Sequence, residues 1–353
     1  MGTKNSLLVL GAVCASAILS AMDVVSLTRQ LVDIESLTGN ESQVGEFLIE
    51  HLTALGYQTE QMPVERHRFN VWATPDEEPA PALVFSTHID TVPPFIPSSE
   101  DNENIYGRGS CDAKGIIAAQ IFAAEQLRAA GILCGLLFVV GEERDSLGAA
   151  VANQHARGSR FLINGEPTEN RIALASRGAL RVEVTARGRM AHSAYPELGE
   201  SAIDKLLDAL QSLRAMPLPH NDEIGTSTLN IGIIEGGRAT NVIPDFAKAQ
   251  LLYRLVGPSE DLRKKIVTAV GARAEVDFVL DIPFMNFRNV PDVPAMTASF
   301  TTDIPKLSAW GEPVLLGPGS ILVAHTDREY IPKEQLRSAV DLYARVARHL
   351  LGR

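Results

Sequence analysis

Five segments spread along this chain each carry a side chain that can bind a metal ion, placed where an apolar or glycine-rich run ends. The five side chains are those of His88, Asp112, Glu143, Glu166 and His325, and Asp90 and Glu142 stand beside two of them. Two imidazoles and several carboxylates, with no cysteine required, form a hard ligand set that suits a pair of divalent ions. Such a set points to metal-assisted hydrolysis.

The apolar runs that lead to these residues predict buried strands of a parallel sheet, because they are short and show no polar alternation. Strands are predicted at 82–87, 136–140 and 161–164, helices at 23–35, 42–55 and 113–130, and Pro- and acid-rich surface loops at 73–81 and 93–104. Alternation of strands and helices is typical of an α/β fold. Open α/β sheets bind ligands beyond the carboxyl ends of their strands, so residues as distant as His88 and His325 can meet in one crevice.

The pattern changes near residue 175. Segments 180–187, 228–234 and 247–255 alternate between apolar and polar residues, and 201–214 carries an apolar helical stripe. Alternation is typical of an antiparallel sheet with one solvated face. Buried-core character returns near residue 286 and continues to a final helix at 333–351. We therefore predict a mostly parallel α/β catalytic domain, sandwiched by helices and formed by residues 22–174 and 286–353, with a smaller α+β domain inserted at 175–285.

Composition limits the class of protein. The chain has 353 residues, 45% of them hydrophobic, and a net charge of −11, which excludes the basic footprint of a nucleic-acid-binding protein. Its three cysteines, an odd number, argue against a disulfide framework and favour a reducing, cytoplasmic location. The apolar run within residues 1–21 is shorter than the roughly 20 residues of a stable membrane span. It is either a signal-like segment of an exported protein or an artefact of a start upstream of Met22, and we favour Met22.

Each predicted ligand also has a simpler interpretation. Asp112 precedes a predicted helix and could be its N-cap. Glu166 and His325 could be ordinary polar residues at strand ends. The adjacent carboxylates of Glu142 and Glu143, however, follow a buried strand and would repel each other unless cations or solvent compensated their charge. The five sites together therefore favour a metal centre.

Several longer strings extend this pattern. They are Ser86–Pro93, Gly107–Gly115, Gly141–Glu143, Gly165–Thr168, Met190–Ala194, Thr240–Pro244 and the Gly317–Gly319 segment before His325. In order and spacing they resemble the dinuclear zinc aminoacylases and metallopeptidases, over roughly residues 23–353. That family contains acetylornithine deacetylase, succinyl-diaminopimelate desuccinylase and the glutamate carboxypeptidases.

The resemblance implies a role for each residue of the centre. His88 and Glu166 would bind one metal ion, Glu143 and His325 the other, and Asp112 would bridge the two. Asp90 would accept the second ring proton of His88 and so fix its tautomer. Glu142 would be the general base that takes a proton from water and passes it to the departing amine. Zn²⁺ is the favoured metal, and Co²⁺ and Mn²⁺ remain open.

The inserted domain contributes further candidates by the same resemblance. His192 would reach the active site of a partner subunit and stabilise the oxyanion, which implies a homodimer. Arg254, supported by Asn241 and Arg177, would bind the substrate carboxylate, since a guanidinium matches a carboxylate with two parallel hydrogen bonds. Arg254 lies on an alternating strand, so a place on a merely solvated face stays open.

The expected activity is hydrolysis of the amide bond of a small N-acyl amino acid. The strings Gly317–Ser320, Ala324–Asp327 and Glu329–Tyr330 look closest to the acetylornithine deacetylase branch. Desuccinylation of succinyl-diaminopimelate and a carboxypeptidase or dipeptidase activity remain alternatives, because one chemical group changes selectivity by only about 1–3 kcal/mol. A catalytically silent metal-binding dimer is disfavoured, since such a protein would have no reason to keep Glu142.

Overall fold

The computed structural model describes residues 23–222 and 224–353, which form two compact units. The first unit comprises the described residues up to Leu174, together with Phe287–Met296 and Thr302–Arg353. The inserted unit comprises Ala175–Asn286 and Thr297–Thr301. The predicted signal-like segment at 1–21 and the choice of Met22 as the start lie outside the described residues. None of the helices in the described part of the chain is long and apolar enough to cross a membrane.

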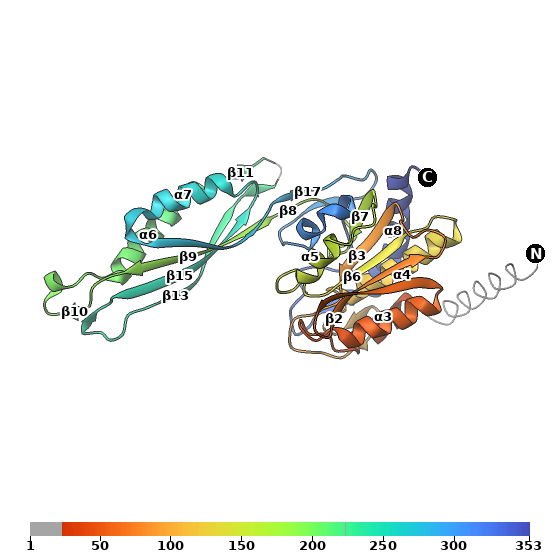
Figure 1. Ribbon diagram of the computed structural model, residues 1–353, viewed down its shortest axis with the longest axis horizontal. Coiled ribbons are helices and arrows are strands. Elements are labelled where there is room, and N and C mark those ends of the chain that lie inside the picture. Colours follow the sequence, from red (N-terminus) through yellow and green to blue (C-terminus); the bar gives the residue numbers. More distant parts are fainter. Residues whose placement is uncertain (1–22, 223) are drawn as a thin grey trace, which may run out of the picture. The chain divides into compact units, whose positions relative to one another are not determined.

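The first unit is built around a mixed sheet (Figure 1). Its strands follow the order β1 (Tyr57–Glu65), β2 (Arg68–Pro75), β6 (Gly135–Val139), β3 (Leu83–His88), β7 (Phe161–Asn164), β19 (Glu312–Leu315) and β8 (Ile172–Ser176), which continues into the inserted unit. The four central strands, from β6 to β19, are mutually parallel. Antiparallel pairs, β1–β2–β6 on one side and β19–β8 on the other, flank them. The predicted α/β class is confirmed.

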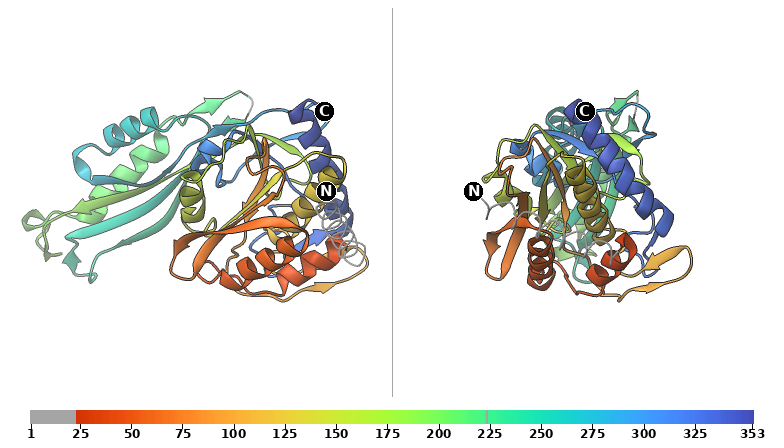
Figure 2. Two further views of the ribbon diagram at one scale, coloured as in Figure 1. Left: turned by 45° about the vertical axis from the view of Figure 1, so that its right-hand side comes forward. Right: turned by 90° about the vertical axis from the view of Figure 1, so that its right-hand side faces the viewer.

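Helices cover both faces of this sheet, as the predicted sandwich requires (Figure 2). One face packs against α2 (Val24–Val32), α3 (Ser42–Ala54), α4 (Lys114–Ala129) and α8 (Lys333–Leu351), and the other against α5 (Leu147–Asn153). Successive side chains of a strand point to opposite faces. In β3, accordingly, Phe85 belongs to the core under α4 and α8, whereas Val84 belongs to the core under α5. Burial on both faces explains the unbroken apolar runs of the central strands.

The predicted surface loop at 73–81 is wrong at its beginning. Residues 73–75 belong to β2, and Ala73 and Thr74 are buried. The Pro- and acid-rich composition of the whole stretch favoured a loop prediction. In the structure this end of β2 pairs with β1 on one side and β6 on the other. The second predicted loop, 93–104, contains the short strand β4 (Ser99–Glu100) and reaches the start of β5 (Asn104–Tyr106).

The inserted unit is an antiparallel sheet with helices on one face. Its strand order is β13 (Thr228–Gly236), β15 (Phe246–Leu255), β9 (Gly178–Arg187) and β16 (Glu275–Ile282), and its helices are α6 (Ala202–Ala215) and α7 (Glu260–Val270). Apolar residues of β9 and β15 pack under the two helices. The opposite face is polar, with Lys248 and Glu183 paired at 2.6 Å across neighbouring strands. The predicted alternation is confirmed in β9 and β15, whereas β13 is exposed at most of its positions.

The remaining strands are short. They are β10 (Ala191–His192), β11 (His220–Asn221), β12 (Gly225–Thr226), β14 (Val242–Ile243), β17 (Met285–Asn286), β18 (Ala295–Ala298) and β20 (Tyr330–Pro332). Within the inserted unit, β10 pairs with β14 to form a two-stranded sheet of its own. In the first unit, β20 pairs with β5 close to the segment that carries Asp112.

Candidate metal centre

Three predicted ligands emerge from neighbouring parallel strands of the first unit. His88 is the last residue of β3, Glu143 follows the end of β6, and Glu166 follows the end of β7. Because β3 pairs in parallel with both β6 and β7, their carboxyl ends lie at one edge of the sheet. This is the edge at which open α/β sheets bind ligands.

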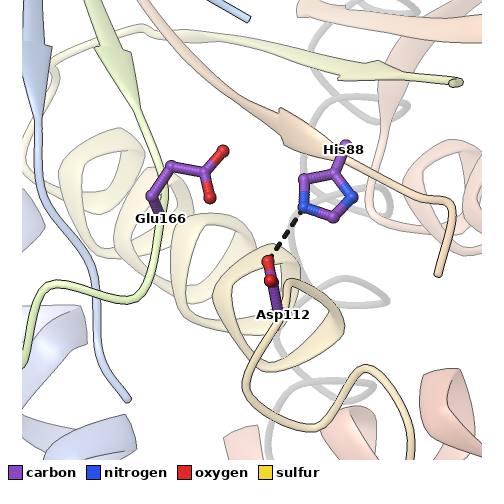
Figure 3. A group of neighbouring side chains, drawn as sticks. All are labelled: His88, Asp112 and Glu166. Atoms are coloured by element: carbon purple, nitrogen blue, oxygen red, sulfur yellow. Dashed lines mark hydrogen bonds and ion pairs between the residues drawn. The ribbon is translucent and has the colours of Figure 1, made fainter. Parts of the chain in front are cut away.

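The first group of possible ligands is buried and consists of His88, Asp112 and Glu166. One ligand atom from each lies within 4.8 Å of the other two. Figure 3 shows the three side chains around a common centre, with Nε2 of His88 3.0 Å from Oδ1 of Asp112. Oε1 of Glu166 is buried and has no hydrogen-bond partner among the described residues.

The second group consists of Asp112, Glu143 and His325. Nε2 of His325 lies 2.9 Å from Oε1 of Glu143 and 3.4 Å from Oδ2 of Asp112. Asp112 is thus common to both groups, and its two oxygens face different histidines. A carboxylate shared in this way has the geometry of a bridging ligand.

The structure contradicts the alternative interpretation of Asp112 as an N-cap and the strand expected before His325. Asp112 is not the N-cap of α4, because the cap position is Ala113 and no side chain caps the helix. Its carboxylate is therefore left available for the centre. His325 does not follow a strand, since β19 ends at Leu315 and residues 321–325 form a turn. Gly317–Gly319 lies between the end of β19 and this turn. The apolar residues Ile321–Ala324 therefore belong to the turn and not to a strand.

The electrostatics of the centre call for cations. Burial, followed by the charge of Glu166, holds the pKa of Glu142 well above its usual range. Burial also raises the pKa of Glu166. Hydrogen bonds to Asp112 and Glu143 raise the pKa of His325 to about 10. In the metal-free chain these groups therefore bind protons more readily than usual. Bound cations would compensate the negative charge of the carboxylates in place of those protons.

The residues fit a pair of divalent ions. Ligand atoms held at about 2.0–2.2 Å from one tetrahedral ion lie roughly 3–3.5 Å from each other. The contacts of His88 and His325 with Asp112 and Glu143, at 2.9–3.4 Å, match that spacing. The unpartnered oxygen of Glu166 is available as a further ligand atom.

Asp90 contacts both His88 and the loop that follows β6. Nδ1 of His88 lies 3.0 Å from the backbone oxygen of Asp90 and 3.5 Å from its carboxylate. The carboxylate oxygens accept hydrogen bonds from the backbone N–H groups of Gly141, Glu142 and Glu143 at 3.0, 3.1 and 3.2 Å. Asp90 therefore holds the loop that presents Glu142 and Glu143, in addition to orienting the imidazole.

Two buried carboxylates near the centre were not predicted. Asp303 is 1% exposed, and burial raises its pKa to about 7. Glu329 is 2% exposed and hydrogen-bonds to the loop that ends at Asp112. Neither follows a continuous apolar strand, so the signal that revealed the other carboxylates was absent. Only the folded structure shows that these two carboxylates are buried.

The inserted unit brings His192 and Asn241 together. His192 of β10 is opposite Val242 of β14, and the N–H of Ser193 donates to the backbone oxygen of Asn241 at 3.0 Å. Nδ1 of His192 accepts a hydrogen bond from the N–H of Ala194 at 3.1 Å. In neutral imidazole the other nitrogen then carries the proton. Nε2 of this exposed histidine is therefore a hydrogen-bond donor.

The two predicted arginines differ in how they are engaged. Arg254 is half-buried on the polar face of β15, burial lowers its pKa, and no described carboxylate lies within ion-pair distance. Arg177 donates to the backbone oxygens of Ile224 and Thr226 at 2.8 and 3.4 Å. Arg254 is thus the freer cation. The metal-ligand candidates all belong to the first unit, whereas His192, Asn241 and both arginines belong to the inserted unit.

Comparison with known proteins extends over nearly the whole chain. Residues 174–277 match a family described as a peptidase dimerisation domain. A peptidase M20 domain-containing protein of Schizosaccharomyces pombe is 38% identical over 341 residues, 93% of this chain and 85% of that protein. A probable carboxypeptidase of Aspergillus fumigatus is 38% identical over 389 residues, 95% of this chain and 88% of that protein.

Solved structures show the same fold. A tripeptidase from Staphylococcus aureus has a TM-score of 0.79 at 23% identity, covering 92% of this chain and 98% of its own. A dinuclear metal-binding peptidase from Bacillus subtilis has a TM-score of 0.65 at 16% identity, covering 92% and 96%.

Proposed function

This chain belongs to the M20 family of metal-dependent peptidases, and we propose that it hydrolyses the amide bond that joins an acyl or peptidyl group to a carboxyl-terminal amino acid. The observation that carries the proposal is the position of Asp112 between two histidine-containing groups of ligands. A carboxylate with one oxygen toward each group suits a centre of two ions, which can act on both the water and the scissile carbonyl.

In this proposal His88 and Glu166 would hold one ion, Glu143 and His325 would hold the other, and Asp112 would belong to both sites. Bound Zn²⁺, or Co²⁺ or Mn²⁺ in its place, would polarise the substrate carbonyl and lower the pKa of water toward about 7. Every ligand is an imidazole or a carboxylate, a set that all three ions accept.

The protein's own groups then move the proton and orient the substrate. Glu142 accepts a proton from the water whose oxygen adds to the carbonyl carbon. It returns that proton to the nitrogen as the C–N bond breaks and the amine departs. Nε2–H of His192, which is free to donate, stabilises the oxyanion in the active site of the partner subunit, and Arg254 binds the carboxylate of the substrate.

A peptide substrate is favoured over N-acetylornithine. The relative from Aspergillus fumigatus is named a probable carboxypeptidase, and its similarity extends over 95% of this chain and so over both units. Deacetylation of N-acetylornithine is the second candidate, favoured by the string from Gly317 to Tyr330. Desuccinylation of succinyl-diaminopimelate is the third.

A panel of substrates separates these candidates. Free-amine release by the zinc-reconstituted protein would be measured on dipeptides, longer peptides, N-acetylornithine and succinyl-diaminopimelate, each with and without a chelator. We expect chelator-sensitive turnover of a peptide with a free carboxyl terminus. Turnover concentrated on N-acetylornithine would overturn the peptide assignment and keep the hydrolase. No turnover with two metal ions bound would contradict the proposed reaction.

We also propose a homodimer that forms through the inserted unit. Among the described residues, β13 pairs only with β15, so its other edge is open, and Ile233 and Ile234 of β13 are 51% and 56% exposed. An open, apolar edge strand invites pairing with a second chain. Ile234→Lys should give monomers in light scattering, whereas Val279→Lys on the opposite edge strand, β16, should leave the dimer intact. A dimer that survives Ile234→Lys would place the interface elsewhere.

A further inference from the structure

Glu329 is not one of the candidate metal ligands, yet its buried side chain accepts four hydrogen bonds. Its Oε1 accepts from the backbone N–H groups of Gly109, Cys111 and Asp112 at 2.9, 3.1 and 3.1 Å. Its Oε2 accepts from Nη1 of Arg108 at 2.6 Å. The side chains of Glu329 and Arg108 are 0% and 2% exposed, so the whole arrangement is buried.

The backbone of Glu329 continues the same contact. Its carbonyl oxygen accepts from the N–H of Gly107 at 3.1 Å. Gly109 has a φ of +85°, a left-handed conformation that glycine adopts without strain. A side chain at this position would also meet Cγ2 of Thr91 at 2.8 Å. Residues 107–112, which we name the Asp112 loop, therefore fold around one carboxylate.

Glu329 also lies in the segment that supplies His325. The turn at 321–325 presents His325, and Glu329 follows before β20 begins at Tyr330. One end of this short segment thus contacts the two oxygen ligands Asp112 and Glu143 through an imidazole, while the other end holds the backbone of Asp112. Two ligand-bearing segments far apart in sequence are tied together at this point.

We propose that Glu329 is a positioning residue that fixes Asp112 for simultaneous contact with both metal ions. The inference rests on the proposed metal-dependent hydrolysis. A charged acceptor forms stronger hydrogen bonds to N–H groups than a neutral one does. A carboxylate shared by two ions must direct both oxygens correctly at once, so small shifts of its backbone affect both sites.

Neutralising Glu329 tests this role. Glu329→Gln keeps one acceptor oxygen but removes the charge that holds Arg108 and the three N–H groups. We expect a fall of about 10–100-fold in kcat and in Zn²⁺ affinity, with KM little changed. Zn²⁺ affinity is measured by competition with a chromophoric chelator, independently of activity. Glu329→Asp, which keeps the charge on a shorter side chain, should give intermediate values and serves if Glu329→Gln does not fold.

Glu125→Gln is the matched control. Glu125 is a mostly buried carboxylate of α4, paired with Arg128 at 2.6 Å, and it bonds to neither ligand-bearing segment. Both Glu→Gln variants should lower the melting temperature of the metal-free chain, but only Glu329→Gln should weaken Zn²⁺ binding. Wild-type affinity and kcat in a folded Glu329→Gln protein would overturn the inference. A wild-type chain that binds no Zn²⁺ would instead contradict the proposed function.

Discussion

Oδ1 of Asp90 accepts a hydrogen bond of 3.1 Å from the backbone N–H of Glu142. The proposed base is therefore tied to Asp90, which also contacts the candidate ligand His88. The same carboxylate receives the N–H groups on either side of Glu142. Asp90 and Glu329 act alike in this respect, since each gathers the N–H groups of a loop that presents a ligand.

Asp90→Asn should lower kcat and Zn²⁺ affinity by about 10–100-fold, because one charged acceptor is lost from three N–H groups and from the surroundings of His88. Thr38→Val is the matched control. Oγ1 of Thr38 donates to Asp90 at 2.8 Å but forms no described hydrogen bond with the residues 141–143 that present Glu142. Its effect should be several-fold smaller. Steady-state kinetics and chelator competition measure both quantities. Equal losses in the two variants would show that Asp90 acts only through local stability.

Glu142→Gln should lower kcat by about 10²–10⁴-fold, because amide oxygen cannot take the proton of the attacking water. Zn²⁺ stoichiometry should remain at the wild-type value, since Glu142 belongs to neither group of ligands. Glu143→Gln, by contrast, should lose both activity and bound metal. Metal analysis of the dialysed proteins checks the difference. Substantial activity in Glu142→Gln would place the base elsewhere.

The metal-free chain should lose stability as the pH rises from about 6.5 to 10. Hydrogen bonds to Asp112 and Glu143 raise the folded-state pKa of His325 from 6.5 to about 10. The folded state therefore binds this proton more tightly than the unfolded state, and the resulting stability is present below pH 6.5 and lost on the way to pH 10. Melting temperatures of the chelated protein across this range measure the loss.

Zn²⁺ should reduce that dependence, because the imidazole of His325 must release its proton to bind the metal. Calorimetric titration with Zn²⁺ in buffers of different ionisation enthalpy should show net proton release. His325→Gln removes the group and should flatten the pH dependence of the chelated chain. An unchanged slope in this variant would assign the effect to other residues.

His192 should act on the partner's active site. In a mixture of Glu142→Ala and His192→Ala chains, a mixed dimer then contains one site with both residues intact, and random pairing should restore about a quarter of wild-type activity. If His192 acts within its own chain, the mixture stays as inactive as its parents. Co-expression with two affinity tags and assay of the doubly purified dimer distinguishes the outcomes.

The sequence predicted the parts of the centre that depend on buried strands. His88, Glu143 and Glu166 each follow a short, continuous apolar run, and such runs form the middle of a parallel sheet. The ends of neighbouring parallel strands lie together for geometric reasons, so the proximity of these ligands followed from their local patterns.

Other features depend on contacts that no local pattern encodes. The hairpin of β1 and β2 escaped prediction because β1 mixes exposed and buried positions without strict alternation. Glu329 is separated from the Asp112 loop by more than two hundred residues, and its role lies in the N–H groups it receives. Backbone N–H groups are common to nearly all residues, so the sequence contains no mark of which of them a distant carboxylate will bind.

The order of ligands along the chain has a consequence during protein synthesis. Glu166 precedes the inserted unit, and His325 and Glu329 follow it. At about 5–20 residues per second, the ribosome needs roughly 10–30 s to travel from Glu166 to His325. A nascent chain can therefore fold much of the central sheet without a complete hydrolytic centre. The proposed amide hydrolysis becomes possible only after the whole inserted unit has been translated, because His325 follows that unit in the chain.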